Sequence, residues 1–146
     1  MKRLILLIFF LTLTLSGCKI QTPDQHFSAG SIDAAGAVSL RIDATRAGYD
    51  FPVLPDGGQL LEWTVPLAAG DTAWTLLDRA AREYGLTVVH TGSGASCYVS
   101  GIGGLFEFDR GPLSGWIYKV NGEQLSISCG EAVLRDGDIL EWIYSL

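Results

Sequence analysis

The chain has 146 residues, of which 48% are hydrophobic, and a formal net charge of −6 at pH 7. This length suits one ordinary domain with additional segments. The acidic charge, with no cluster of Lys or Arg beyond the first residues, argues against nucleic-acid binding and against docking on an anionic lipid surface, because both need cationic side chains.

The first 18 residues have the features of an export signal. Lys2 and Arg3 precede an apolar run over residues 4–11, and Leu15-Ser16-Gly17-Cys18 closes the stretch. The run is shorter than the roughly 20 apolar residues that a transmembrane helix needs, and its flanks suit a secretory signal. The pattern resembles a bacterial lipoprotein signal peptide. It predicts removal of residues 1–17, lipid on Cys18, and a protein held at the bacterial cell membrane that faces outside the cytoplasm. The alternative is a signal anchor in which Cys18 is an ordinary thiol.

Residues 18–36 are polar and lack apolar periodicity, which predicts a lipidated flexible tether before a folded domain over residues 37–146. Alternation of apolar and polar residues predicts strands over 38–43 and 61–65, separated by a loop. Apolar residues at helical spacing predict one helix over 72–84, with Asp71 as its N-cap and Gly85 just past its end.

After the helix, short apolar runs predict strands near 86–90, 98–99, 106–108, 116–120 and 139–144, with a turn at Asn121-Gly122. The order strand, strand, helix and then several strands predicts an α+β fold with one helix packed on a mixed sheet. A period of two places Trp116, Tyr118 and Val120 on one face of their strand. Leu140, Trp142 and Tyr144 likewise share a face. These rings either form the core of the sheet or line a platform for a ligand.

Residues that could perform catalysis or bind metal are sparse. His90 is the one His within the predicted domain, and it is interpreted as structural or exposed. Asp136 and Asp138 could contact Ca²⁺, but an Asp-Gly-Asp turn before a strand needs no ion. The sequence therefore predicts no catalytic residues, no metal site and no enzyme activity.

Two cysteines, Cys97 and Cys129, remain if Cys18 carries lipid. A compartment outside the cytoplasm permits a disulfide between them, and closing a loop of roughly 33 residues would stabilise the domain by about 3–4 kcal/mol. The alternatives are two free buried thiols, or a catalytic Cys97 that acts with His90.

The segment from Tyr98 to Tyr144 carries a resemblance. It contains Gly115-Trp116-Ile117-Tyr118-Lys119-Val120-Asn121-Gly122 and Leu134-Arg135-Asp136-Gly137-Asp138. These motifs resemble the bacterial extracellular domains similar to the C-terminal domain of transcobalamin, within the soluble-ligand-binding β-grasp group. The resemblance implies a β-grasp-like fold over residues 37–146.

The same resemblance implies a binding domain rather than an enzyme, with no cofactor and with cobalamin or another corrinoid as the candidate ligand. Trp116 would be the first ligand contact, followed by Tyr118 and by Ser126, Ile127 and Ser128 of the next loop. The alternative is a cell-surface module that docks on another surface protein or a transporter and has no small-molecule ligand.

Overall fold

Two β-sheets and one α-helix make up the part of the chain that the structure, a computed structural model, describes: residues 36–48, 50 and 52–146. The predicted α+β class is confirmed. All of these elements belong to the compact unit Ile32–Leu146. This unit has its own hydrophobic core, so we expect it to fold as a domain by itself.

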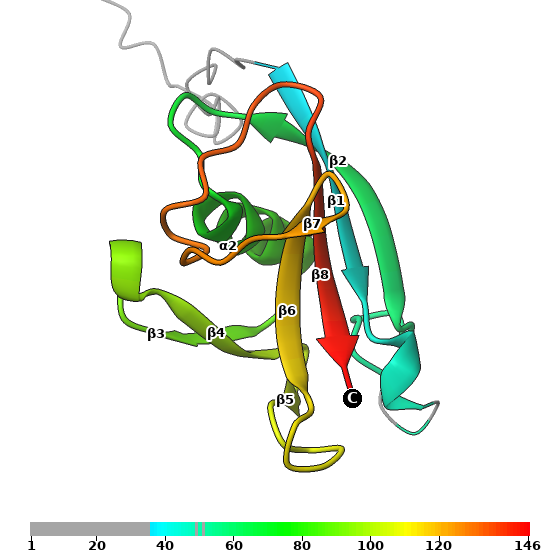
Figure 1. The fold of residues 1–146 in the computed structure, drawn as a ribbon. Coiled ribbons are helices and arrows are strands. Elements are labelled where there is room, and N and C mark those ends of the chain that lie inside the picture. Colours follow the sequence, from blue (N-terminus) through cyan, green and yellow to red (C-terminus); the bar gives the residue numbers. More distant parts are fainter. Residues whose placement is uncertain (1–35, 49, 51) are drawn as a thin grey trace, which may run out of the picture. The chain divides into compact units, whose positions relative to one another are not determined.

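The larger sheet has five strands in the order β2-β1-β8-β6-β7 (Figure 1). The strands are β1 (Gly36–Asp43), β2 (Leu60–Leu67), β6 (Gly115–Val120), β7 (Glu123–Gln124) and β8 (Ile139–Ser145). β1 runs parallel to β8, and the other neighbours are antiparallel, so the sheet is mixed as predicted. The parallel pair at its centre joins the first strand of the domain to the last.

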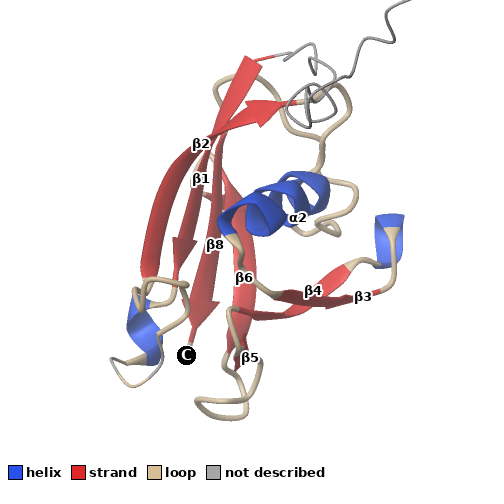
Figure 2. Ribbon diagram, turned by 180° about the vertical axis from the view of Figure 1, so that it is seen from behind, coloured by secondary structure: helices blue, strands red, loops and turns tan. Residues whose placement is uncertain are grey.

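The smaller sheet was not predicted. It consists of β3 (Val88–Thr91), β4 (Tyr98–Ile102) and β5 (Leu105–Phe106), in that order. The sequence predicts that these segments join one sheet with the rest, but in the structure they pair only with one another and diverge from the five-stranded sheet (Figure 2). The predicted strand over 106–108 is also shorter than expected, because Phe108 turns out of it with φ +69°.

Helix α2 (Ala73–Tyr84) covers one face of the five-stranded sheet (Figure 1). Its apolar stripe, which includes Leu76 and Leu77, is fully buried. Along β1 and β8, buried residues alternate with partly or fully exposed ones, and Leu140, Trp142 and Tyr144 are all buried. The predicted shared face is therefore confirmed. Burial of each such Leu or Val stabilises the fold by about 1.5–3 kcal/mol. The contact between the helix and the sheet is therefore a main part of the hydrophobic core.

The start of helix α2 differs from the prediction. Thr72, not Asp71, is the N-cap, and it forms a capping box with Thr75. Asp71 is buried and accepts hydrogen bonds from the Ala68 backbone N–H (2.8 Å) and from both terminal nitrogens of Arg79 (2.9 and 2.7 Å). Burial alone would raise the pKa of Asp71, but these hydrogen bonds hold it below its ordinary value.

The loop that follows β7 folds back onto this end of the helix. β6 and β7 are joined by a turn with positive φ at Asn121 (53°) and Gly122 (81°), which confirms the predicted turn and fits a tight hairpin. The carbonyls of Cys129 and Ala132 then accept the backbone N–H groups of Trp74 (3.0 Å) and Ala73 (2.9 Å). The first N–H groups of a helix have no partner within it, so the loop satisfies two of them and is fixed in place.

Within the described residues, no helix combines the length and hydropathy that crossing a membrane would require. The predictions for residues 1–17 and for Cys18 lie outside the described part of the chain.

Candidate functional site

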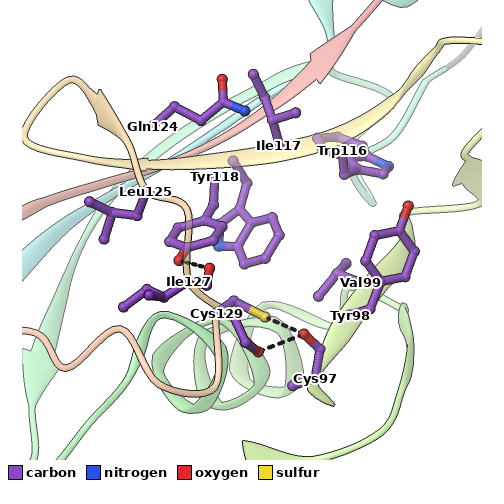
Figure 3. Close-up of a pocket in the computed structure, with 12 residues that line it drawn as sticks. Cys97, Tyr98, Val99, Trp116, Ile117, Tyr118, Gln124, Leu125, Ile127 and Cys129 are labelled. Atoms are coloured by element: carbon purple, nitrogen blue, oxygen red, sulfur yellow. Dashed lines mark hydrogen bonds between the residues drawn. The ribbon is translucent and has the colours of Figure 1, made fainter. Parts of the chain in front are cut away.

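A pocket of about 200 Å³ lies where the start of β4, strand β6 and the loop after β7 meet (Figure 3). We call it the β4–β6 pocket. It is lined by Cys97, Tyr98, Val99, Trp116, Ile117, Tyr118, Gln124, Leu125, Ile127, Ser128, Cys129 and Trp142. No Asp, Glu, Lys, Arg or His is among these residues, so the wall is aromatic, apolar and uncharged.

Trp116 borders the pocket but is mainly a core residue. Its side chain is 5% exposed, and its indole N–H donates a buried hydrogen bond to the Leu105 carbonyl at 2.8 Å. Its ring meets that of Tyr144 edge to face, with 5.3 Å between centroids. The polar group of Trp116 is therefore committed to the fold, and only its ring can face a ligand.

Tyr118 and Ile127 form one side of the pocket together. The Tyr118 hydroxyl donates to the Ile127 carbonyl at 2.6 Å (Figure 3), and the Tyr118 ring lies 5.5 Å from that of Trp142. Burial raises the pKa of Tyr118 above its ordinary value, and so do the nearby Cys129 and Glu131. The hydrogen bond ties the loop to β6, while the side chain of Ile127 is half exposed at the rim.

Ser128 holds the loop against the start of β4. Its hydroxyl lies 2.8 Å from the Cys97 carbonyl and 2.9 Å from the Gly94 carbonyl, and it accepts the Gly130 N–H at 3.2 Å. Ser126 is exposed and does not line the pocket. The structure thus brings four of the five predicted ligand contacts together and leaves Ser126 outside.

Cys97 and Cys129 are direct neighbours beneath the loop. Both are buried free thiols here, and the Cys129 thiol donates to the Cys97 carbonyl at 3.5 Å. Burial, and secondarily the neighbouring Cys97, raises the pKa of Cys129 to about 12. The structure contains no disulfide among the described residues, so the bond stays a prediction. A catalytic Cys97–His90 pair finds no support in the contacts, since the exposed His90 ring lies on Trp74 at 4.0 Å.

Several lining residues were missed by the sequence reasoning, above all Tyr98. Its ring is 47% exposed at the mouth of the pocket, and its hydroxyl donates to the carboxylate of Glu107. That hydrogen bond, together with burial, raises the pKa of Tyr98 to about 12. Tyr98 and Trp116 belong to two different predicted strands with the predicted strand over 106–108 between them, and no spacing rule connects them.

Metal-binding groups do not gather in the described part of the chain, which has no cluster of three or more His, Cys, Asp or Glu side chains. Asp136 accepts the Ala37 N–H at 2.8 Å, and Asp138 accepts from Asn121 at 2.9 Å and from the Arg135 N–H at 2.8 Å. These two carboxylates serve the turn before β8, so their presence in the sequence is explained without Ca²⁺.

Comparison with solved structures finds a similar fold in haptocorrin. The crystal structure of haptocorrin in complex with Cbi superposes with a TM-score of 0.56 and 21% sequence identity, covering 75% of this chain and 25% of that chain. The described domain therefore corresponds to about a quarter of the haptocorrin chain. A putative metal-binding protein from Ruminococcus gnavus ATCC 29149 matches with a TM-score of 0.49 and 13% identity, covering 75% of this chain and 93% of that one. No curated protein matches the chain.

A family model described as "Domain of unknown function (DUF4430)" matches residues 70–145. The match extends over more than half of the chain, from the start of helix α2 to the end of β8, and it includes every residue that lines the β4–β6 pocket. The chain belongs to the DUF4430 family.

Proposed function

We propose that this chain is a membrane-anchored binding module that works outside the cytoplasm and holds part of a soluble ligand in the β4–β6 pocket. The observation that carries the proposal is the wall of that pocket, in which aromatic and apolar side chains surround a few polar groups. Sites for small molecules have this composition. Catalysis is not part of the proposed role, which is capture of the ligand near the membrane.

A corrinoid is the ligand to test first. The similar haptocorrin structure was solved in complex with Cbi, and the Trp116 motif resembles that of transcobalamin-like domains. The pocket volume of about 200 Å³ is below the roughly 300–1,000 Å³ of sites that enclose a drug-sized ligand. In this proposal a corrinoid lies against the mouth of the pocket and places only one of its groups inside.

The test is titration calorimetry of cobalamin and cobinamide with the chain that begins at Ile32. Two exposed aromatic residues of neighbouring segments form a matched pair of variants, because Tyr98 lines the pocket and Phe108 does not. Tyr98→Ala is expected to weaken binding about tenfold or more, as the loss of an aromatic contact at a binding centre does. Phe108→Ala should bind as the unaltered chain does. Absence of heat and of any spectral change at high corrinoid concentration would remove the corrinoid from the proposal.

The proposed anchor is lipid on Cys18. It rests on the Leu15-Ser16-Gly17-Cys18 pattern after a short apolar run. More than one acyl chain is needed for stable anchoring, so the modified Cys18 should carry at least two. Growth of the bacterium with a labelled fatty acid is expected to label the full chain and not its Cys18→Ala variant. Equal label in the two chains would place the lipid on another residue. No label in either chain would show that the protein carries no lipid.

A second candidate function is docking on another surface protein, and one observation favours it. The loop between β5 and β6 presents Leu113, which is 90% exposed, and Phe108, which is 62% exposed. Phe108 holds a positive φ of 69°, and backbone strain of this kind is found at functional loops. Cross-linking in whole cells, with Leu113→Asp compared with Tyr98→Ala, separates the two candidates. Loss of a cross-linked partner only with Leu113→Asp would favour docking.

A further inference from the structure

The smaller sheet reaches the loop after β7 through a very close backbone contact. β3, the short 3-10 helix Gly94–Ser96 and β4 form an arm that diverges from the five-stranded sheet (Figure 2). We call residues 94–97 the arm tip. A Cβ at Gly130 of the loop would come within 2.3 Å of the Gly94 carbonyl oxygen and 3.0 Å of the Cys97 Cβ. Because Gly130 has no side chain, the loop backbone can lie directly on the arm tip.

Neutral side-chain contacts hold the arm in this position. The Ser128 hydroxyl lies 2.8 Å from the Cys97 carbonyl oxygen and 2.9 Å from that of Gly94. A hydroxyl has a single hydrogen, so it donates to one of these carbonyls at a time. The ring of His90 in β3 lies 4.0 Å from that of Trp74. Neutral hydrogen bonds add little net stability, because water replaces them when they break, so contacts of this kind permit local opening.

The loop itself is held more firmly, on helix α2. The Cys129 carbonyl accepts the Trp74 N–H at 3.0 Å, and the Leu134 N–H donates to the Asp71 carbonyl at 2.8 Å. These backbone hydrogen bonds serve the start of the helix, whose first N–H groups need partners outside it. When the contact between the loop and the arm opens, the arm tip is therefore the part that moves.

Two buried thiols lie in this contact, one on each side of it. Cys97 belongs to the arm tip and is 5% exposed, and Cys129 belongs to the loop and is 4% exposed. The Cys129 thiol donates to the Cys97 carbonyl at 3.5 Å (Figure 3), and the Cys97 side chain contributes to the raised pKa of Cys129. A bond between the two sulfur atoms would join the arm tip covalently to the loop.

The same contact borders the β4–β6 pocket. Residues 97–99 of the arm and 127–129 of the loop line it from different sides (Figure 3). Movement of the arm tip away from the loop would therefore widen the pocket on the side of β4.

We propose that Cys97 and Cys129 form a redox switch that controls the opening of the β4–β6 pocket. In the dithiol form the arm tip opens and closes, and in the disulfide form it is held closed on the loop. A compartment outside the cytoplasm permits such a disulfide. The switch itself needs no ligand, whereas its effect on ligand release rests on the proposed function. A ligand that enters the dithiol form leaves slowly once the disulfide has formed.

The closing step consists of two thiol–disulfide exchanges, with a low-molecular-weight disulfide such as oxidised glutathione as the oxidant. The Cys97 thiolate attacks one sulfur of the oxidant, the other sulfur leaves as a thiolate, and a mixed disulfide forms. The Cys129 thiolate then attacks the Cys97 sulfur and releases the second thiol. The pair loses two electrons and two protons, and the oxidant gains them. Cys129 reacts second because its pKa is raised to about 12, so its thiolate forms less readily.

The test compares the two redox states of the chain that begins at Ile32, by hydrogen–deuterium exchange and mass spectrometry. One sample is treated with oxidised glutathione and the other with a phosphine reductant, and peptide mapping verifies each state. Peptides that cover the arm tip should exchange about tenfold faster or more in the dithiol form, because a cross-link suppresses local opening. Low concentrations of urea should leave that rate unchanged, since local opening exposes little surface. An arm-tip rate that rises with urea as global unfolding does overturns the switch and makes the pair merely structural.

Two variants sharpen the comparison. Ser128→Ala should speed exchange of the arm tip several-fold in the dithiol form and hardly at all in the disulfide form, where the covalent bond replaces the hydroxyl contacts. The matched control is the double variant Cys97→Ala with Cys129→Ala, which should respond to neither reagent. If a variant does not fold, the unaltered chain in its two redox states still decides. Equal exchange of the arm tip in these states, or failure of oxidised glutathione to link the two cysteines, overturns the switch.

Cobinamide is the probe for ligand release. It should dissociate about tenfold more slowly from the disulfide form than from the dithiol form, because opening of the pocket then limits release. Equal dissociation from the two forms overturns the effect on release. If cobinamide binds neither form while exchange of the arm tip still depends on the redox state, the corrinoid function fails and the switch stands.

Discussion

Replacing Trp116 with Phe distinguishes a structural role for this residue from the ligand contact that the sequence motif implies. The change leaves the Leu105 carbonyl without its 2.8 Å buried hydrogen bond, which costs about 1–3 kcal/mol. It also removes about two buried ring carbons, at about 0.8 kcal/mol each. We therefore expect Trp116→Phe to lower the free energy of unfolding by about 3 kcal/mol.

The assay is urea unfolding of the chain that begins at Ile32, followed by far-UV circular dichroism so that the signal does not depend on tryptophan. With a urea dependence near 1.5 kcal/mol per molar, 3 kcal/mol shifts the midpoint by roughly 2 M. The matched control is Trp74→Phe. Trp74 is only partly buried and stacks on His90, so its replacement should cost less than about 1 kcal/mol. If Trp116→Phe unfolds within about 0.5 kcal/mol of the unaltered chain, the structural assignment of Trp116 is wrong.

Three further predictions concern charged groups and thiols. Asp71→Asn should lower the free energy of unfolding by roughly 2 kcal/mol at pH 7, because hydrogen bonds to a charged group are lost. The pKa of Asp71 in the folded chain lies below its ordinary value of 3.8. The stabilisation by Asp71 is therefore fully present above pH 3.8 and is lost as the pH falls through the folded pKa. In acid unfolding, the Asp71→Asn chain and the unaltered chain should become equally stable at that low pH. Glu107→Gln should move the pKa of Tyr98 from about 12 toward 10.0, and an unchanged absorbance titration of phenolate would contradict the hydrogen bond. In the reduced, folded chain, Cys129 should be alkylated far more slowly than in urea, because its pKa is about 12 and the thiolate is the reactive form; peptide mapping by mass spectrometry measures both rates.

The elements that could be predicted from the sequence are those whose signal is local. The apolar spacing of helix α2 and the alternation in β8 place side chains on one face without reference to the rest of the chain. The turn at Asn121-Gly122 follows from the positive φ that these residues tolerate. The N-cap was predicted at Asp71, but Arg79 binds the Asp71 carboxylate and Thr72 caps the helix instead.

The second sheet depends on a close fit of side chains that the alternation of apolar and polar residues does not contain. Gly101 of β4 pairs with Phe106 of β5, and a Cβ at Gly101 would come within 2.6 Å of the Phe106 ring. The missing side chain lets the ring lie over β4, but a glycine in a strand pattern also suits a bulge or a bend. The β4–β6 pocket could not be predicted from local patterns either. Tyr98 and Trp142 reach the β4–β6 pocket from strands far apart in the sequence, so no spacing rule could join them.

The outer face of the five-stranded sheet carries charges that decide which kind of partner suits it. The strand register aligns Glu62, Arg41, Glu141 and Lys119 in one row across β2, β1, β8 and β6, with charges that alternate in sign. Arg41 lies 3.5 Å from Glu62, and opposite charges on neighbouring strands stabilise the sheet in water. A row of this kind would lose hydration under an apolar partner.

In the two candidate functions, contacts with a soluble ligand are expected at the β4–β6 pocket, and contacts with a protein partner are expected at the loop that carries Phe108 and Leu113. These two surfaces share a link, because the Tyr98 hydroxyl at the pocket mouth donates to Glu107, the residue before Phe108. Glu107→Gln weakens that link without removing a ring from either surface. Its effect on ligand affinity should consequently be small if the pocket alone binds. A marked loss of affinity would mean that the loop takes part in holding the ligand, and the two candidate functions would then be aspects of one binding surface.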